Sequence, residues 1–119
     1  MQHMLMFYDT PDSFACRTDE RAGDYFAGWS AYVQALVQSG AVRDGNGLEV
    51  PETSTVVRLR GAERLIQDGP IADTKEQLGG YFIIEVDNLD AALAWAARAP
   101  CASTGGVEVR PVMTPPVAS

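Results

Sequence analysis

Apolar positions along the chain fall into short strand-like runs separated by two helical stripes. The run Met4–Tyr8 ends at the turn signal Asp9-Thr10-Pro11-Asp12, which predicts a buried strand followed by a turn. From Ala22 onward, apolar residues recur in steps of three, one and four, as on one face of a helix. We expect this helix at about residues 19 to 39. Thr18 is its expected N-cap and Gly40 its C-terminal stop.

The rest of the chain predicts five further strands and a second helix. A weak strand is expected in the Gly-rich residues 41–48, and a hairpin in residues 55–60 and 63–67, with one face of the first hairpin strand buried. Residues 81–86 are apolar on both faces, which is typical of a central strand. Asn88 is the expected N-cap of a helix that Pro100 ends, and residues 107–110 form the last strand.

This order of elements predicts an α+β domain. It matches the ferredoxin-like β-α-β-β-α-β plan with an extra hairpin, as one domain over residues 1–119 with a loose tail from about residue 113. Two helices can cover only one face of such a sheet. Since the other face is also apolar, we expect a homodimer that stacks two sheets.

Composition excludes several classes of protein. With 119 residues, 46% hydrophobic content and a formal net charge of −7, the chain is typical of a globular protein and is expected not to bind nucleic acid directly. No apolar run predicts a membrane helix or signal peptide, so we expect a cytoplasmic protein. One histidine, together with reduced thiols at Cys16 and Cys101, predicts neither a metal site nor a cofactor.

A long polar loop leads directly into the most apolar strand. The segment from Asp68 to Tyr81 carries Asp73, Lys75 and Glu76. These charges and Asp68 are candidates for an acid–base set. The alternative, which we favour, is structural: Asp68-Gly69-Pro70 fixes a turn, the Asp68 carboxylate accepts hydrogen bonds from loop N–H groups, and Glu76 and the other charges hold the loop. Gly79-Gly80 then permits close packing and matches no phosphate-binding pattern.

Other candidates are isolated side chains. Asp9 follows a buried strand, so it is either a base facing a cleft or a turn cap. Trp29 and Tyr32 lie on the apolar helix face and suit either core or pocket wall. His3 is expected to pack in the strand. The only cluster of basic residues is Arg58, Arg60 and Arg64. An anion site and an exposed edge are both open for the strand residues Arg58, Arg60 and Arg110, and exposed edge arginines are the more common case.

The order and spacing of these motifs resemble the YCII-related proteins, in the branch that is named for a DGPF motif. Members of that branch are similar to the string DGPFAETKEQLGGYYLIEV, where this chain has residues 68–86 with Ile71 for Phe and Asp73 for Glu. Residues 88–100 and 106–112 continue the match, so the resemblance covers nearly the whole chain.

The resemblance implies a dimeric α/β-barrel, hence a homodimer, and says less about activity. The wider family carries a proposed His/Asp pair. Asp9 falls near the Asp position and Trp29 near the His position, so this pair is incomplete here and enzymatic activity stays open.

Two functions are compatible with the resemblance. The first is a small-molecule-binding protein or minor enzyme with a pocket between sheet and helix, lined by Asp9, Trp29, Tyr32, Lys75 and Tyr81. The alternative is a non-enzymatic regulatory module linked to extracytoplasmic sigma factors. A third interpretation gives the motif a role in folding and dimerisation only.

Overall fold

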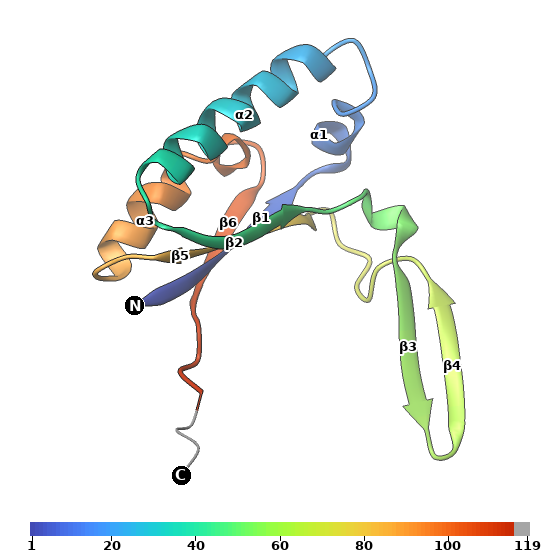
Figure 1. Ribbon diagram of the computed structural model, residues 1–119. Coiled ribbons are helices and arrows are strands. Elements are labelled where there is room, and N and C mark those ends of the chain that lie inside the picture. Colours follow the sequence, from blue (N-terminus) through green and yellow to red (C-terminus); the bar gives the residue numbers. More distant parts are fainter. Residues whose placement is uncertain (116–119) are drawn as a thin grey trace.

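The computed structural model describes residues 1–115 and is built on a four-stranded antiparallel sheet (Figure 1). The order in the sheet is β2-β5-β1-β6, where β1 is Gln2–Asp9, β2 Val42–Gly47, β5 Gln77–Glu85 and β6 Gly106–Pro111. The first and last strands of the chain are therefore neighbours. This arrangement is the mixed α+β, ferredoxin-like plan that the pattern predicts.

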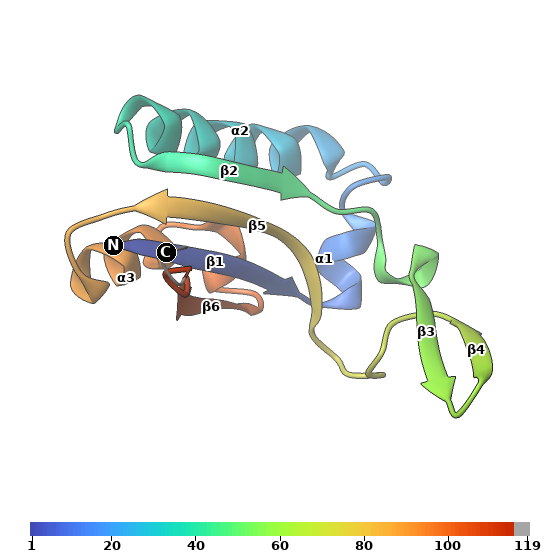
Figure 2. The same cartoon turned by 60° about the horizontal axis from the view of Figure 1, so that its bottom comes forward.

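The helices cover one face of the sheet (Figure 2). They are α1 (Pro11–Ala15), α2 (Ala22–Gln38) and α3 (Leu89–Ala97), with short 3₁₀ turns η1 (Pro51–Thr53) and η2 (Pro100–Ala102). The Asn88 side chain accepts a hydrogen bond from the Ala91 N–H at 2.9 Å, so its predicted role as N-cap is confirmed. No helix within residues 1–115 has the length and apolar character needed to cross a membrane.

The segment after the first strand differs from its prediction. Residues 11–15 form a helix rather than a turn, because Thr10 caps them by accepting a hydrogen bond from the Ser13 N–H and Pro11 occupies the first turn. Thr18 does not cap α2. That helix begins at Ala22 after Arg21, whose guanidinium forms ion pairs with Asp12 and Asp19 in the connection.

Strict alternation along β1 divides the sheet into two faces. Its odd-numbered residues, including Leu5 and Phe7, are buried under the helices together with Leu36 and Ile84. His3 lies in the same buried layer, as expected, although its Nδ1 has no hydrogen-bond partner within residues 1–115. The opposite face carries half-buried apolar side chains that no helix covers: Met4, Met6, Tyr8, Leu78, Tyr81 and Ile83. We call these six residues the open sheet face.

A β-bulge interrupts the pairing of β1 with β5. Phe7 pairs with Gly80, whereas the next residue, Tyr8, pairs with Leu78, so Gly79 is an extra residue in β5. The bulge brings Gln77 opposite Asp9. Leu78 consequently lies across from Tyr8 on the open sheet face.

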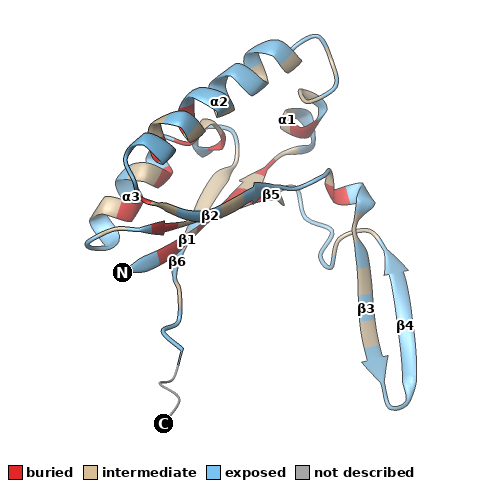
Figure 3. Cartoon of the chain, viewed as in Figure 1, coloured by how far each residue is buried: buried red, intermediate tan, exposed pale blue. Residues whose placement is uncertain are grey.

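The predicted hairpin is present, but its predicted burial is wrong. Strands β3 (Thr55–Arg60) and β4 (Glu63–Asp68) form a separate two-stranded sheet that extends from the body of the molecule (Figures 1 and 3). Every residue of β4 is exposed, and no residue of β3 is fully buried. The alternation in β3 indicated a strand with one apolar face, yet nothing in residues 1–115 covers that face.

The predicted loose tail lies partly outside the structure. Residues 113–115 have no regular secondary structure and are exposed, and residues 116–119 are outside the described residues.

Candidate functional site

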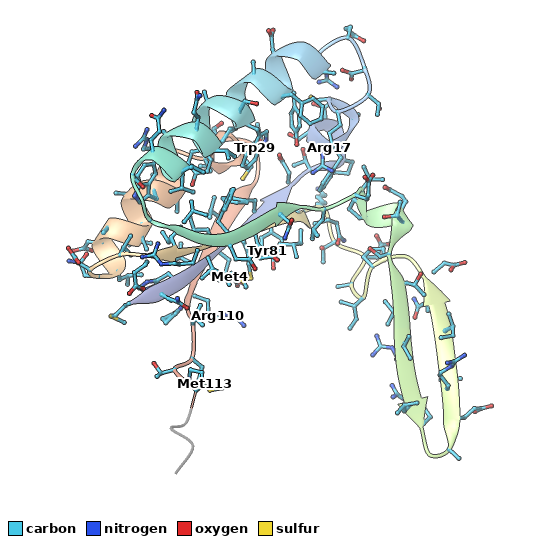
Figure 4. All side chains as sticks on the ribbon, viewed as in Figure 1. Met4, Arg17, Trp29, Tyr81, Arg110 and Met113 are labelled. Carbon is cyan, nitrogen blue, oxygen red and sulfur yellow. The ribbon has the colours of Figure 1, made fainter. Side chains whose placement is uncertain are left out.

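A cavity of about 570 Å³ lies between α1, α2 and the half of the sheet formed by β2 and β5. Each bordering element contributes a different kind of group. The helices and strands supply an aromatic wall, the end of β1 supplies Asp9, and the turn after α1 supplies Arg17. Figure 4 shows Trp29 and Arg17 on the helix side of the sheet. Besides Tyr81, six aromatic residues border the cavity: Phe7, Phe14, Tyr25, Phe26, Trp29 and Phe82.

Edge-to-face contacts fix the aromatic wall. The ring of Phe7 lies 5.1 Å from Trp29 and 6.0 Å from Phe82, measured between centroids, with both pairs steeply inclined. Such pairs add stability beyond the area that they bury. Gly45 makes room for this wall, because a Cβ at that position would lie 2.1 Å from the Phe82 ring. The aromatic wall of the cavity therefore consists of rings that contacts with one another hold in place.

Asp9 is a buried carboxylate with one oxygen already engaged. Its Oδ1 accepts hydrogen bonds from the Thr10 N–H at 3.0 Å and from the Thr104 hydroxyl at 2.9 Å. Among residues 1–115, no group donates to Oδ2. Asp9 therefore borders the cavity and also holds the backbone at the start of α1 through the Thr10 N–H, while its role as a base stays a prediction.

Arg17 is a cation that the sequence interpretation missed. It donates hydrogen bonds to the Tyr25 hydroxyl, the Leu48 carbonyl and the Gly79 carbonyl, and its guanidinium carbon lies 5.0 Å from the Phe14 ring centre. These bonds join the turn after α1 to β2 and β5. No carboxylate in the described chain pairs with Arg17, and a guanidinium carries further N–H groups beyond those used. A positive charge therefore borders the cavity without a neutralising partner.

Three of the five predicted pocket residues border the cavity, and two do not. Asp9, Trp29 and Tyr81 border it, although strand alternation turns the Tyr81 ring toward the open sheet face, where its hydroxyl accepts a hydrogen bond from the Asn46 amide at 3.1 Å. Tyr32 and Lys75 are not among the residues around the cavity.

Tyr32 lies in the core instead. Its hydroxyl donates to the Trp95 carbonyl at 2.9 Å, and burial raises the pKa of this phenol to about 12. Its ring makes an edge-to-face contact with Trp29, one of the rings that border the cavity.

The central loop is held differently from the prediction. No N–H group within residues 1–115 donates to the Asp68 side chain, and neither Lys75 nor its acidic neighbours form ion pairs. The Gln77 amide instead donates to the carbonyls of Ala72 and Thr74, while the Gly69 N–H donates to the Ser54 carbonyl at 2.7 Å. Gly69 has φ +97°, so the turn depends on glycine rather than on the Asp68 carboxylate.

Gly79, in contrast, lies where close packing occurs. A Cβ at Gly79 would meet the Phe14 ring at 2.9 Å and the Arg17 guanidinium at 3.2 Å. Because Gly79, the extra residue of the bulge, has no side chain, the Phe14 ring and the Arg17 guanidinium can pack against β5 at this point.

Cys101 borders the cavity but is a buried thiol. Burial raises its pKa to about 12, and the Asp9 charge adds to this effect. Cys16 and Cys101 are both free, as expected. Within residues 1–115, no three His, Cys, Asp or Glu side chains are grouped closely enough to hold a metal ion.

These features define an α+β domain with an aromatic cavity between helix and sheet. The sequence matches the model of the YCII-related domain over residues 1–115, so the chain belongs to the YCII-related family. An uncharacterised protein from Rhizobium meliloti strain 1021, R00369, is 36% identical over 85 residues, which cover 70% of this chain and 68% of that protein.

A solved structure of an enzyme has a similar fold. It is 5-chloro-2-hydroxyhydroquinone dehydrochlorinase (TftG) from Burkholderia phenoliruptrix AC1100, in complex with 2,5-dihydroxybenzoquinone. The TM-score is 0.55 at 17% identity, over 95% of this chain and 94% of that one. At this identity, the likeness concerns the fold.

Proposed function

We propose that this protein is a homodimeric small-molecule-binding protein or minor enzyme of the DGPF branch, whose cavity takes a planar, conjugated ring compound with acidic oxygen atoms. The single observation that carries this proposal is that an Arg17 guanidinium with no carboxylate partner within residues 1–115 and a buried Asp9 border the same aromatic-walled cavity. A cavity of about 570 Å³ falls within the size range of small-molecule sites.

Each part of the cavity suits one part of such a ligand. Arg17 attracts an ionised oxygen, since its charge has no carboxylate partner within residues 1–115. Asp9 can accept the hydrogen of a ligand hydroxyl through Oδ2, and in an enzyme it would be the general base. Rings such as Phe7 and Trp29 contact a flat apolar body. The dihydroxybenzoquinone in the TftG complex is a compound of this kind.

Binding measurements test the proposal. In calorimetry, we expect 2,5-dihydroxybenzoquinone to bind the wild-type protein and Arg17→Gln to weaken binding about tenfold or more, the usual scale for losing a charge-assisted hydrogen bond. Arg21→Gln is the matched control, because Arg21 forms ion pairs with Asp12 and Asp19 and does not border the cavity. Equal binding by both variants would remove the assigned role of Arg17. The regulatory alternative predicts that no planar acid binds.

The homodimer rests on a separate observation, the open sheet face. By strand alternation and register, its six apolar side chains lie on the side of the sheet away from the helices, and two such faces can stack about 10 Å apart. We expect an interface above roughly 1,000 Å². Sedimentation should show a dimer, and Ile83→Glu should dissociate it, whereas Glu85→Gln on the same strand should not. A wild-type chain that stays monomeric at high concentration would contradict the dimer.

A further inference from the structure

The β3–β4 hairpin, residues 55–68, carries apolar side chains that nothing in the described chain covers. We call it the hairpin arm. Pairing of Val57 with Ile66 and of Leu59 with Arg64 brings three apolar residues onto one face of the arm. Val57 is 57% exposed, Leu59 67% and Ile66 54%. A contiguous apolar face of this kind is unusual on a monomer unless a partner covers it.

An isolated two-stranded hairpin is also marginally stable in water. Within residues 1–115 the arm pairs only with itself, and it is joined to the body at its base, where the Gly69 N–H donates to the Ser54 carbonyl. The radius of gyration is 16.5 Å, whereas a compact chain of this length has about 13.5 Å. The accessible surface is 7984 Å², against about 6,300 Å² for a compact monomer of this mass. The chain thus exposes more surface than a self-contained monomer does.

The direction of the arm indicates what covers it. In Figures 1 and 2 the arm extends from the body toward the side of the sheet that the helices leave open. Six residues per strand give the arm a reach of about 20 Å, roughly twice the spacing of two stacked sheets. A second copy stacked on the open sheet face would therefore lie beside the arm, and the arm would extend past its sheet.

Charge favours the same partner. The arm carries three of the nine basic residues, Arg58, Arg60 and Arg64, but only two of the sixteen acidic ones. The remaining chain thus has six basic and fourteen acidic residues. Because the arm is net positive and the body strongly negative, the arm of one copy is attracted to the body of another.

We propose that the hairpin arm of each subunit packs against the flank of the second subunit, with Val57, Leu59 and Ile66 in the contact, Arg64 on the same face, and the net positive charge of the arm attracting it to the acidic body. This inference rests on the homodimer of the proposed function. It adds a second interface, formed by reciprocal arms, to the stacked sheets.

Hydrogen exchange of the wild-type protein tests the contact directly. The arm amides should be protected at concentrations well above the dimer dissociation constant and should exchange rapidly after dilution well below it. Sedimentation of the same samples reports the dimer independently. If the chain sediments as a dimer but the arm amides exchange rapidly at all concentrations, the arm contact is overturned and the sheet-stacked dimer stands. If the chain is monomeric throughout, both are overturned.

Substitutions give a second readout. The triple variant Val57→Thr, Leu59→Thr, Ile66→Thr keeps strand propensity and removes apolar surface, so it should raise the dimer dissociation constant by about tenfold or more. Thr55→Ser with Gln67→Asn changes exposed polar arm residues and is the matched control, which should not change it. Replacing Arg58, Arg60 and Arg64 by Gln should weaken the dimer at low salt and flatten its salt dependence. Unchanged dissociation constants in both triple variants would overturn the arm contact.

Discussion

The Asp9 carboxylate and the Thr104 hydroxyl, 95 positions apart in the chain, are joined by a hydrogen bond of 2.9 Å. The bond links the end of β1 to the loop before β6 and fixes one oxygen of the buried carboxylate. A carboxylate that contacts a ligand must be held in a defined orientation, and the hydrogen bond from Thr104 helps to fix the orientation of Asp9.

Removing this hydroxyl should destabilise the fold. We expect Thr104→Val to lower the free energy of unfolding by about 1.5–3 kcal/mol, because a partly buried hydrogen bond to a charged group is lost. Urea denaturation measures the effect. Thr104→Ser keeps the hydroxyl and should retain most of the stability; an equal loss in both variants would show that the methyl group, rather than the bond, matters.

Gly105, the next residue, should tolerate no side chain. A Cβ there would lie 2.2 Å from the Tyr8 carbonyl oxygen and 2.9 Å from the Asp9 Cα. Because backbone atoms cannot rotate away, Gly105→Ala should cost about 1–3 kcal/mol or more. At Gly47 no atom lies within 4 Å of an added Cβ, so Gly47→Ala should leave stability within about 0.5 kcal/mol or raise it. Thermal melts of the two variants make the comparison.

The turn at the base of the hairpin arm should depend on Gly69 more than on Asp68. Gly69→Ala forces a side chain into the left-handed region at φ +97° and should cost about 1–2 kcal/mol. Asp68→Ala removes an exposed carboxylate that receives no hydrogen bond within residues 1–115, so its effect should stay within about 0.5 kcal/mol. A larger loss for Asp68→Ala, measured by denaturant titration, would restore the carboxylate as the group that fixes this turn.

Alkaline pH should destabilise the protein through Cys101. Burial raises the pKa of this thiol from 9.0 to about 12, so the unfolded chain releases the proton before the folded chain does. The stability that the buried Cys101 thiol contributes is fully present below pH 9 and is lost as the pH rises toward 12. The melting temperature should therefore fall over this range, and less steeply in Cys101→Ala. Tyr32, whose pKa is raised to about 12 in the same way, should sustain part of the fall above pH 10. An identical pH profile for Cys101→Ala would contradict the assignment.

The sequence predicted the sheet and two of the helices because their apolar periods are local. Asn88 and the stripe from Ala22 mark helices without reference to other elements. The short helix α1 was missed, although Thr10 followed by Pro11 is a helix-start signal, because the same residues also favour a turn. The prediction that one face of the hairpin is buried was wrong for another reason. Alternation indicates an apolar face but not whether the same chain covers it.

The site was predicted only in part because several segments meet in it. Asp9 and Trp29 were found from their places on a strand end and an apolar stripe. Arg17 was missed because its importance depends on carbonyls from Leu48 and Gly79, which are distant in sequence. Lys75 was included because a charged loop before a core strand suggests chemistry, but it does not border the cavity.

The bulge at Gly79 makes the length of this strand as important as its composition. Because Gly79 is an extra residue, the residues before it lie on the opposite faces of the sheet from those that regular alternation would give. Gln77 is therefore opposite Asp9, and Leu78 is opposite Tyr8. Regular pairing without the bulge would instead place Gly79 opposite Tyr8 and Leu78 opposite Asp9, which would turn a leucine toward the carboxylate. Insertions in the polar loop upstream should therefore leave this pairing unchanged, whereas one residue inserted between Leu78 and Gly80 would need a wider bulge or would move Leu78 and Gln77 away from Tyr8 and Asp9.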